Sequence, residues 1–293
     1  MAKFAKPEKQ AAAVMKQLQG SVIKSVGTVR NFEQALTTVS NYCRQMKLPS
    51  LRAMKVDDAI TYLELRGQLV GQKALDLERQ ALQKMMHHVS KVLPENQRLP
   101  VIKSEQQQVL KSRAYTDRQV EMVASKQQAS NALATQISYA AGLRAHELFT
   151  LARYDERSAD NRPANSHKWT GRSGTLYTVQ GKGGLIRQVL LPANLATELE
   201  LHRRAQPVTV RDRDINYLSR YNIAGGQRWS NSFSAASKRA LDWSRGAHGL
   251  RHSYAQQRMY ELQMQGLTRG IALETVSQEM GHFRPEITET YLR

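Results

Sequence analysis

Residues that could carry out chemistry on a phosphate group are concentrated in four short segments of the C-terminal half. These segments are AAGLRAHEL (Ala140–Leu148), GKGG (Gly181–Gly184), HGLRHSYA (His248–Ala255) and MGHFRPEITETYL (Met280–Leu292). Arginine side chains bind phosphate oxygens bidentately, and histidine can exchange protons near neutral pH. Together the segments predict a site that binds an anion and activates a nucleophile.

Arg144 comes directly after Gly142-Leu143, where one predicted helix ends and another begins. Glu147 lies three residues further on, so that both side chains project from the same face of the new turn. The arginine could reach an anion while the glutamate holds it in place. An ordinary surface ion pair is the alternative for this pair taken alone.

His248 and Arg251 are also three residues apart, at the start of a predicted helix. The N-terminus of a helix offers free N–H groups and a positive dipole end to an anion. His252 follows at once but points roughly a third of a turn away. A lone histidine is most often structural, and the pairing with Arg251 is what favours a functional role.

The last segment places His282 after an amphipathic stretch (Ile271–Met280) and Tyr291 on a short final helix that Pro285 opens. A tyrosine phenol is a poor nucleophile unless cations stabilise its phenolate. The arginines and histidines of the other segments, with Lys182, are a suitable cationic environment. The same groups would stabilise the charge of a pentacoordinate phosphoryl transition state. The alternatives are a packing role for Tyr291 and a solvent-exposed turn position for Lys182.

The elements that must position these residues fall into two groups. Apolar residues at helical spacing predict a small helical domain, with helices over 28–46, 56–70 and 75–93 and a shorter one around Ala11–Leu18. Pro94 should end the third of these helices, and Cys43 is interpreted as a small buried residue. The stretch 94–114, with two prolines and several glutamines, predicts a linker.

Strand patterns occur only in the second part of the chain. LYTVQ (Leu176–Gln180) and LIRQVLLP (Leu185–Pro192) alternate on either side of GKGG, which predicts a β-hairpin with Lys182 at its tip. Thr116 is a candidate N-cap, a helix is expected over Ala129–Ala141, and helices should dominate after Pro192. The expected fold class is therefore mainly α, with a small β-hairpin or sheet in the second domain. The expected divisions are a basic N-terminal segment (1–27), a helical domain (28–93), a linker (94–114) and an α+β domain (115–293).

The charge of the chain indicates what kind of partner it binds. The 293 residues carry a formal net charge of +18, with +8 on residues 1–110 and +10 on residues 111–293. Such an excess suits nucleic acid, although a soluble basic protein is the simpler alternative. The sequence contains no run of about 18 apolar residues, so no membrane-spanning helix is predicted. The N-terminus MAKFAKPEKQ lacks a secretory signal, so a cytoplasmic location is expected. The single cysteine excludes a disulfide framework and a cysteine-rich zinc site.

The order of these motifs resembles the tyrosine recombinase (phage integrase) family. The hallmark motifs of that family are G-L-R-x-x-E-L, H-x-L-R-H, and G-H separated by eight residues from a tyrosine. Here they stand in the family's order and at similar intervals. The resemblance covers about 114–293, and the helical first part fits the family's core-binding domain in kind. By this resemblance the catalytic residues are Arg144, Lys182, His248, Arg251, His282 and Tyr291, with Glu147 and His252 in support.

The resemblance also implies a mechanism and partners. Tyr291 would form a 3′-phosphotyrosyl bond and release a 5′-hydroxyl, Lys182 would protonate the leaving oxygen, and no metal or other cofactor would be required. The partner would be a specific double-stranded DNA site held in a C-shaped clamp of two domains. A homotetramer would act on two duplexes through a Holliday junction, with accessory DNA-bending proteins as a further partner class. The protein would be nucleoid-associated in the cytoplasm.

Two features depart from the family pattern. Only Leu292 and Arg293 follow Tyr291, whereas family members commonly continue with a segment that docks on a neighbouring protomer. Exchange of the final helix, another linking segment and a shortened chain are the alternatives. The N-terminal extension is also too short for the arm-binding domain of some integrases.

The expected function is site-specific recombination for integration or excision of a mobile element. Chromosome-dimer resolution, inversion and transposition share its chemistry. A catalytically silent DNA-binding regulator on the same fold is the alternative from another class, although such a protein has no need of Tyr291.

Overall fold

The computed structural model describes residues 4–23, 26–107, 111–162 and 164–293, and for Val26 and Lys182 it describes the backbone only. The chain forms two compact units, Met1–Val109 and Leu110–Arg293. The finer division into 1–27, 28–93, 94–114 and 115–293 remains a prediction. No helix in the described ranges has the length and apolar character needed to cross a membrane.

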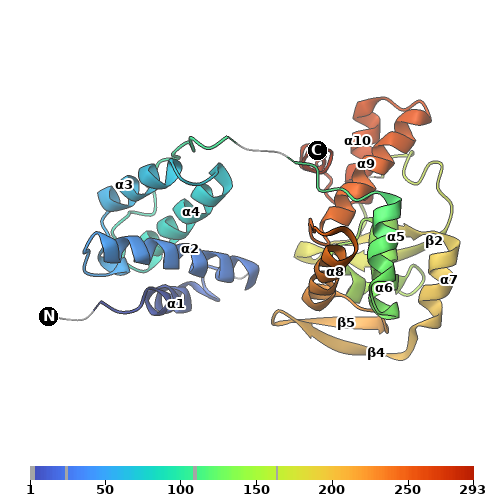
Figure 1. Cartoon of the computed structure of the whole chain (residues 1–293), viewed down its shortest axis with the longest axis horizontal. Coiled ribbons are helices and arrows are strands. Elements are labelled where there is room, and N and C mark those ends of the chain that lie inside the picture. Colours follow the sequence, from blue (N-terminus) through green and yellow to red (C-terminus); the bar gives the residue numbers. More distant parts are fainter. Residues whose placement is uncertain (1–3, 24–25, 108–110, 163) are drawn as a thin grey trace. The chain divides into compact units, whose positions relative to one another are not determined.

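The first unit is a bundle of helices (Figure 1). Its elements are α1 (Pro7–Leu18), α2 (Val26–Gln45), the 3-10 turn η1 (Leu51–Ala53), α3 (Val56–Gly67) and α4 (Gln72–His88). Helix α2 packs against both α1 and α4 because apolar residues recur along one face of each helix. The fully buried side chains include Leu18, Leu36, Val39, Cys43, Leu63, Leu82 and Met85. The burial of Cys43 agrees with its interpretation as a core residue.

Helix α4 ends at His88, earlier than the stop expected at Pro94. The chain leaves the helix because Lys91 adopts a left-handed backbone with φ of 56°. The following segment then runs back over the first unit. The backbone N–H of Glu105 donates to the carbonyl of Gly67 at 2.9 Å, and the Ser104 hydroxyl donates to the carbonyl of Val70 at 2.7 Å. Leu99 and Ser104 also form hydrogen bonds with side chains of α4. The part of the predicted linker from Leu99 to Glu105 is therefore attached to the first unit.

The second unit surrounds a three-stranded antiparallel sheet in the order β1–β2–β3. The strands are β1 (Ala152–Arg153), β2 (Thr175–Gln180) and β3 (Ile186–Leu191), and the turn η3 (Lys182–Gly184) joins β2 to β3. Gln180 pairs with Ile186 and Tyr177 pairs with Val189, which confirms the hairpin predicted from the alternating pattern. The mainly helical fold class with a small sheet is confirmed.

Helices cover this sheet (Figure 1). They are α5 (Asp117–Ser125), α6 (Ala129–Ala141), α7 (Ala193–Leu201), α8 (Gly226–Leu241), α9 (Gly249–Met264), α10 (Arg269–Glu279) and α11 (Pro285–Thr288), with the 3-10 turns η2 (Glu147–Thr150) and η4 (Glu289–Tyr291). The predicted N-cap is confirmed, since the Thr116 hydroxyl accepts the backbone N–H of Gln119 at 3.3 Å. Helices α9 and α10 pack together. Helix α9 carries most of the segment His248–Ala255, and the segment Met280–Leu292 follows directly after α10.

One pair of strands was not expected. A second antiparallel hairpin, β4 (Arg203–Asp212) with β5 (Ile215–Tyr221), lies in the region after Pro192, where helices were expected to dominate and no strand was predicted. Its turn holds Arg213 and Asp214 with φ of 49° and 61°, a conformation in which glycine or asparagine is usual. Because the turn lacks those residues, the usual sequence signal for a hairpin is missing.

Candidate active site

The site begins where α6 ends. Gly142 closes the helix with φ of 59°, and a Cβ atom there would lie 2.8 Å from the ring of Tyr254. Glycine is needed at this position for both reasons. The turn that follows directs Arg144 to Glu147, whose carboxylate accepts the Arg144 backbone N–H at 2.8 Å and Nη1 at 2.7 Å. The pair is thus partly buried and doubly bonded, unlike an isolated surface ion pair.

Glu147 is completely buried and is the anionic centre of three arginines. Besides Arg144, it accepts Nη2 of Arg187 at 2.8 Å, and Nη1 of Arg251 lies 3.9 Å from its Oε2. Burial by itself raises the pKa of a carboxyl group. Arg187, Arg251 and Arg144 outweigh that effect and hold the pKa of Glu147 below its ordinary value. Glu147 is therefore ionised and fixes the three guanidinium groups.

Arg251 stands in the first turn of α9 and is completely buried. Its Nη1 donates to the carbonyl of Gly142, and its Nη2 donates to the carbonyl of Met280 at 3.3 Å. Burial, followed by the nearby charge of Arg144, lowers the pKa of Arg251 to about 10. The arginine remains charged at neutral pH, in a place where charge is costly unless an anion is nearby.

His282 joins Arg251 to the end of the chain. Its Nε2 lies 3.0 Å from Nη2 of Arg251, and its Nδ1 lies 3.0 Å from the hydroxyl of Thr288. Since Arg251 can only donate, Nε2 accepts and Nδ1 carries the proton given to Thr288. Burial, and then Arg251 and Arg144, lowers the pKa of His282 to about 3. His282 is neutral in the free protein.

Tyr291 lies among the three motif histidines. The centre of its ring is 4.8 Å from that of His252, 5.0 Å from that of His282 and 5.4 Å from that of His248. The guanidinium carbon of Arg251 lies 5.5 Å from the same ring centre. Because Tyr291 is only 9% exposed, these contacts surround most of its side chain.

The other two histidines differ in exposure. His252 is buried and its Nδ1 has no hydrogen-bond partner among the described residues, whereas His248 is exposed at the start of α9. Burial, and then Arg113, lowers the pKa of His252 to about 4. Partial burial of its ring, and then Arg251, also lowers the pKa of His248. Both side chains are therefore neutral near pH 7 and are weaker bases than a free imidazole.

Lys182 is the predicted residue whose side chain falls outside the described part of the structure. Its backbone begins η3, at the tip of the β2–β3 hairpin. The neighbouring Gly181 packs closely on the site, since a Cβ atom there would lie 3.2 Å from Oε1 of Glu147. The structure brings together the side chains of Arg144, Glu147, His248, Arg251, His252, His282 and Tyr291. The individual catalytic roles remain predictions.

Sequence reasoning missed Arg187. The alternation of LIRQVLLP places Arg187 in phase with Val189 and Leu191, and all three side chains are buried in the observed strand. A cation in the inward phase of an otherwise apolar strand was the signal that could have revealed it.

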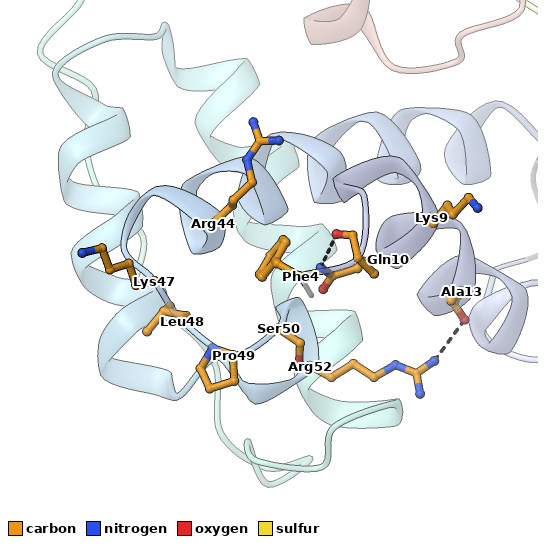
Figure 2. A pocket seen from close by; sticks show the side chains of 11 residues that line it. Phe4, Lys9, Gln10, Ala13, Arg44, Lys47, Leu48, Pro49, Ser50 and Arg52 are labelled. Atoms are coloured by element: carbon orange, nitrogen blue, oxygen red, sulfur yellow. Dashed lines mark hydrogen bonds between the residues drawn. The ribbon is translucent and has the colours of Figure 1, made fainter. Parts of the chain in front are cut away.

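A cavity also lies in the first unit, away from these residues (Figure 2). It is a cavity of about 710 Å³ between α1, the end of α2 and η1, with Phe4, Leu48 and Pro49 among its apolar lining residues. Lys9, Arg44, Lys47 and Arg52 contribute cations to its lining, and Arg52 donates to the carbonyl of Ala13 at 3.3 Å. In the described ranges, no group of three or more His, Cys, Asp or Glu side chains is arranged to hold a metal ion.

Comparison with known proteins gave matches among solved structures only, since no family model and no curated protein matches the chain. XerH site-specific recombinase bound to difH substrate is 17% identical, with a TM-score of 0.54 over 100% of this chain and 94% of that chain. The Tn1549 transposon integrase in complex with transposon right end DNA is 14% identical, with a TM-score of 0.53 over 99% and 95%. A lambda integrase tetramer bound to a Holliday junction is 15% identical, with a TM-score of 0.59 over 99% and 78%. The chain therefore has the fold of the tyrosine recombinases over almost its whole length.

Proposed function

We propose that this protein is a site-specific DNA recombinase that cuts and rejoins DNA through a 3′-phosphotyrosyl intermediate. The observation that carries the proposal is the position of Tyr291, whose ring is surrounded by three histidines and Arg251. These residues come from the start of α9, the turn after α10 and the last turn of the chain. A buried phenol that only packed against the core would have no reason to meet so many cationic or protonatable groups.

The proposed reaction is an in-line displacement at one phosphodiester. The non-bridging oxygens bind Arg144, Arg251 and His282, and the Tyr291 oxygen attacks phosphorus while the bond to the 5′-oxygen breaks. The phenol proton passes to a neutral histidine, for which His248 is the candidate. The 5′-oxygen takes a proton from Lys182. The phosphate ester to Tyr291 conserves the bond energy, so a 5′-hydroxyl can reverse the reaction and rejoin the strand.

The geometry also favours cleavage within one protomer. Tyr291 lies beside the Arg251 and His282 of its own chain, and Gln256 donates to the carbonyl of Tyr291 at 3.1 Å. This hydrogen bond ties the last turn to α9. The tyrosine would therefore attack the phosphate that its own arginines hold.

The fold and the charge support a proposal for the partner and the assembly. The net charge of +18 suits a DNA duplex, and XerH, Tn1549 integrase and lambda integrase were each solved with DNA. Extending this to the present chain, we propose a specific DNA site, a tetramer on two duplexes, and integration or excision of a mobile element. Phosphate contacts would dominate the affinity and make it fall steeply with salt.

The test is formation of a covalent adduct. Binding sites are first selected from random-sequence duplexes, and duplexes nicked at each position of the selected site then serve as suicide substrates. The chain should give an SDS-resistant protein–DNA adduct. Tyr291→Phe should abolish the adduct and retain DNA binding, because it removes only the nucleophilic oxygen.

Tyr260→Phe is the matched control, since this tyrosine is 66% exposed on α9, and it should leave the adduct intact. DNA binding without an adduct from any nicked duplex would instead support a catalytically silent regulator.

A further inference from the structure

Arg187 is a buried cation on β3 that spans two parts of the candidate active site. It is 3% exposed, and its Nη2 donates to the Glu147 carboxylate at 2.8 Å. Its Nη1 donates to the backbone carbonyl of Glu279, the last residue of α10, at 2.7 Å. One guanidinium thus connects the residue that holds Arg144 with the helix end that precedes His282.

The side chain also supports the turn that leads to His282. Gly281 has φ of 72°, and a Cβ atom there would lie 2.5 Å from Cδ of Arg187. The backbone of the turn therefore rests on the aliphatic stem of the arginine. The hydrogen bond to Glu279 and this packing contact are separate observations, and both fix the same turn.

Burying Arg187 is a costly way to stabilise a strand. Its Nε has no hydrogen-bond partner among the described residues, although it is buried. Val189 and Leu191 occupy the same phase of β3 and pack without this cost. Replacing a buried ion pair by apolar residues often stabilises a protein, so stability alone does not explain a charged residue here.

We infer that Arg187 is a positioning residue for the proposed strand-cleavage reaction, which ties the β2–β3 hairpin, the Glu147 carboxylate and the turn before His282 into one rigid frame. This inference rests on the proposed function. Arg187 itself touches no substrate phosphate: it keeps Arg144, through Glu147, and His282 at a fixed separation. The hairpin that carries Lys182 is fixed to the same frame because Arg187 belongs to its second strand.

Arg258 provides a matched control. It is also completely buried, and its guanidinium binds the carboxylates of Glu279 and Glu261 at 3.0 and 3.1 Å. It therefore fixes α9 against α10, and in the described part of the chain it forms no hydrogen bond or ion pair with Glu147 or with Gly281. A residue needed only for folding would behave like Arg258.

The experiment compares Arg187→Lys with Arg258→Lys, because both variants keep the buried charge. A lysine ammonium cannot reproduce the two-pronged contact of Arg187. At saturating DNA, Arg187→Lys should slow covalent adduct formation by at least about tenfold while the DNA dissociation constant changes by less than about threefold. Arg258→Lys should leave both within about threefold of the parent chain. Arg187→Gln serves as a second variant and should slow the reaction further.

A second readout is independent of catalysis. Nitrogen-15 spectra of the histidine rings, recorded without DNA, should show a shifted His282 signal in Arg187→Lys and an unshifted one in Arg258→Lys. Because lysine keeps the positive charge of Arg187, such a shift would reflect a changed position of His282 and not the loss of a nearby charge. Unchanged His282 signals in both Arg187 variants would overturn the inference, as would equal loss of rate in the Arg187 and Arg258 variants. If His282 shifts as expected but the parent chain forms no adduct, the proposed function fails while the positioning of His282 by Arg187 stands.

Discussion

The interiors of the two units of this protein are built from different kinds of side chain. In the first unit the buried side chains are almost all apolar, and Glu78, paired with Arg66 and Tyr62, is its buried carboxylate. The second unit buries Glu147, Arg187, Arg251, Arg258 and Glu279. Buried charges contribute little to stability and often reduce it. Their concentration in one unit fits the proposed strand-cleavage site there, which would need fixed charges more than it needs stability.

The difference in stability between the units can be measured because the unfolding of the second unit has its own spectroscopic signal. Trp169, Trp229 and Trp243 all belong to the second unit, so tryptophan fluorescence follows its unfolding in the intact chain. Far-ultraviolet circular dichroism follows the helices of both units.

The largest effect is expected at Glu147. Glu147→Gln leaves three buried or half-buried arginines around a neutral amide, and removing one partner of a buried charge network costs about 3–5 kcal/mol. The urea midpoint of the fluorescence transition should fall accordingly.

Glu78→Gln is the matching change in the first unit. The side chain of Arg66 is 22% exposed and can turn toward water, so the loss should be only about 1–2 kcal/mol. Equal losses from the two substitutions would remove the distinction between the units.

Arg144→Ala should separate catalysis from stability. Its side chain is 25% exposed, and Glu147 keeps Arg187 and Arg251 as partners, so the second unit should lose only about 1–2 kcal/mol of stability. If Arg144 holds a non-bridging oxygen, covalent adduct formation should slow by about 10²–10³-fold, or about 3–4 kcal/mol in the transition state. Single-turnover cleavage of the nicked duplex measures this loss. A rate within about threefold of the parent chain would exclude the assigned role.

The second unit should also be the more sensitive to acid. Because folding holds the pKa values of His252 and His282 at about 4 and about 3, the unfolded state binds more protons below the ordinary histidine pKa of 6.5. The contribution of these histidines to the free energy of unfolding is therefore fully present above pH 6.5. It is lost as the pH falls toward the pKa values that the histidines have in the folded state. Each of these two histidines should contribute a loss of about 1–2 kcal/mol between pH 6.5 and 5.

Urea titrations across this pH range, followed by fluorescence, measure the effect. His252→Gln should reduce the pH dependence of the free energy of unfolding by the contribution of one histidine. His87 and His88 of the first unit are only half-buried, and replacing either by glutamine is the control that should leave the fluorescence transition unchanged.

The same contrast between the units explains which features of the structure could be predicted from the sequence. Helical periodicity located the first-unit helices because apolar burial is their main requirement, and Gly142, Thr116 and the GKGG turn marked boundaries in the second unit by local conformation. The candidate site residues were proposed from the order of the motifs, and the structure brings together those whose side chains it describes. Arg187 and the β4–β5 hairpin were missed for a common reason. Arg187 depends on its contacts with Glu147 and Glu279, and the hairpin depends on the contact between the rings of Phe149 and Tyr217. These contacts join segments that are distant in the sequence, so the residue pattern of one strand cannot reveal them.

The smallest effect is expected at Cys43, in the apolar core of the first unit. Cys43 is completely buried on α2, and burial raises the pKa of its thiol to about 11, so it behaves as a neutral apolar group. Cys43→Ala removes one sulfur atom and should cost about 1 kcal/mol for the lost packing. The circular dichroism transition should move slightly, while tryptophan fluorescence and adduct formation stay unchanged. If this change in the first unit altered the fluorescence transition as well, the units would unfold together, and the stability differences expected above would have to be referred to the whole chain.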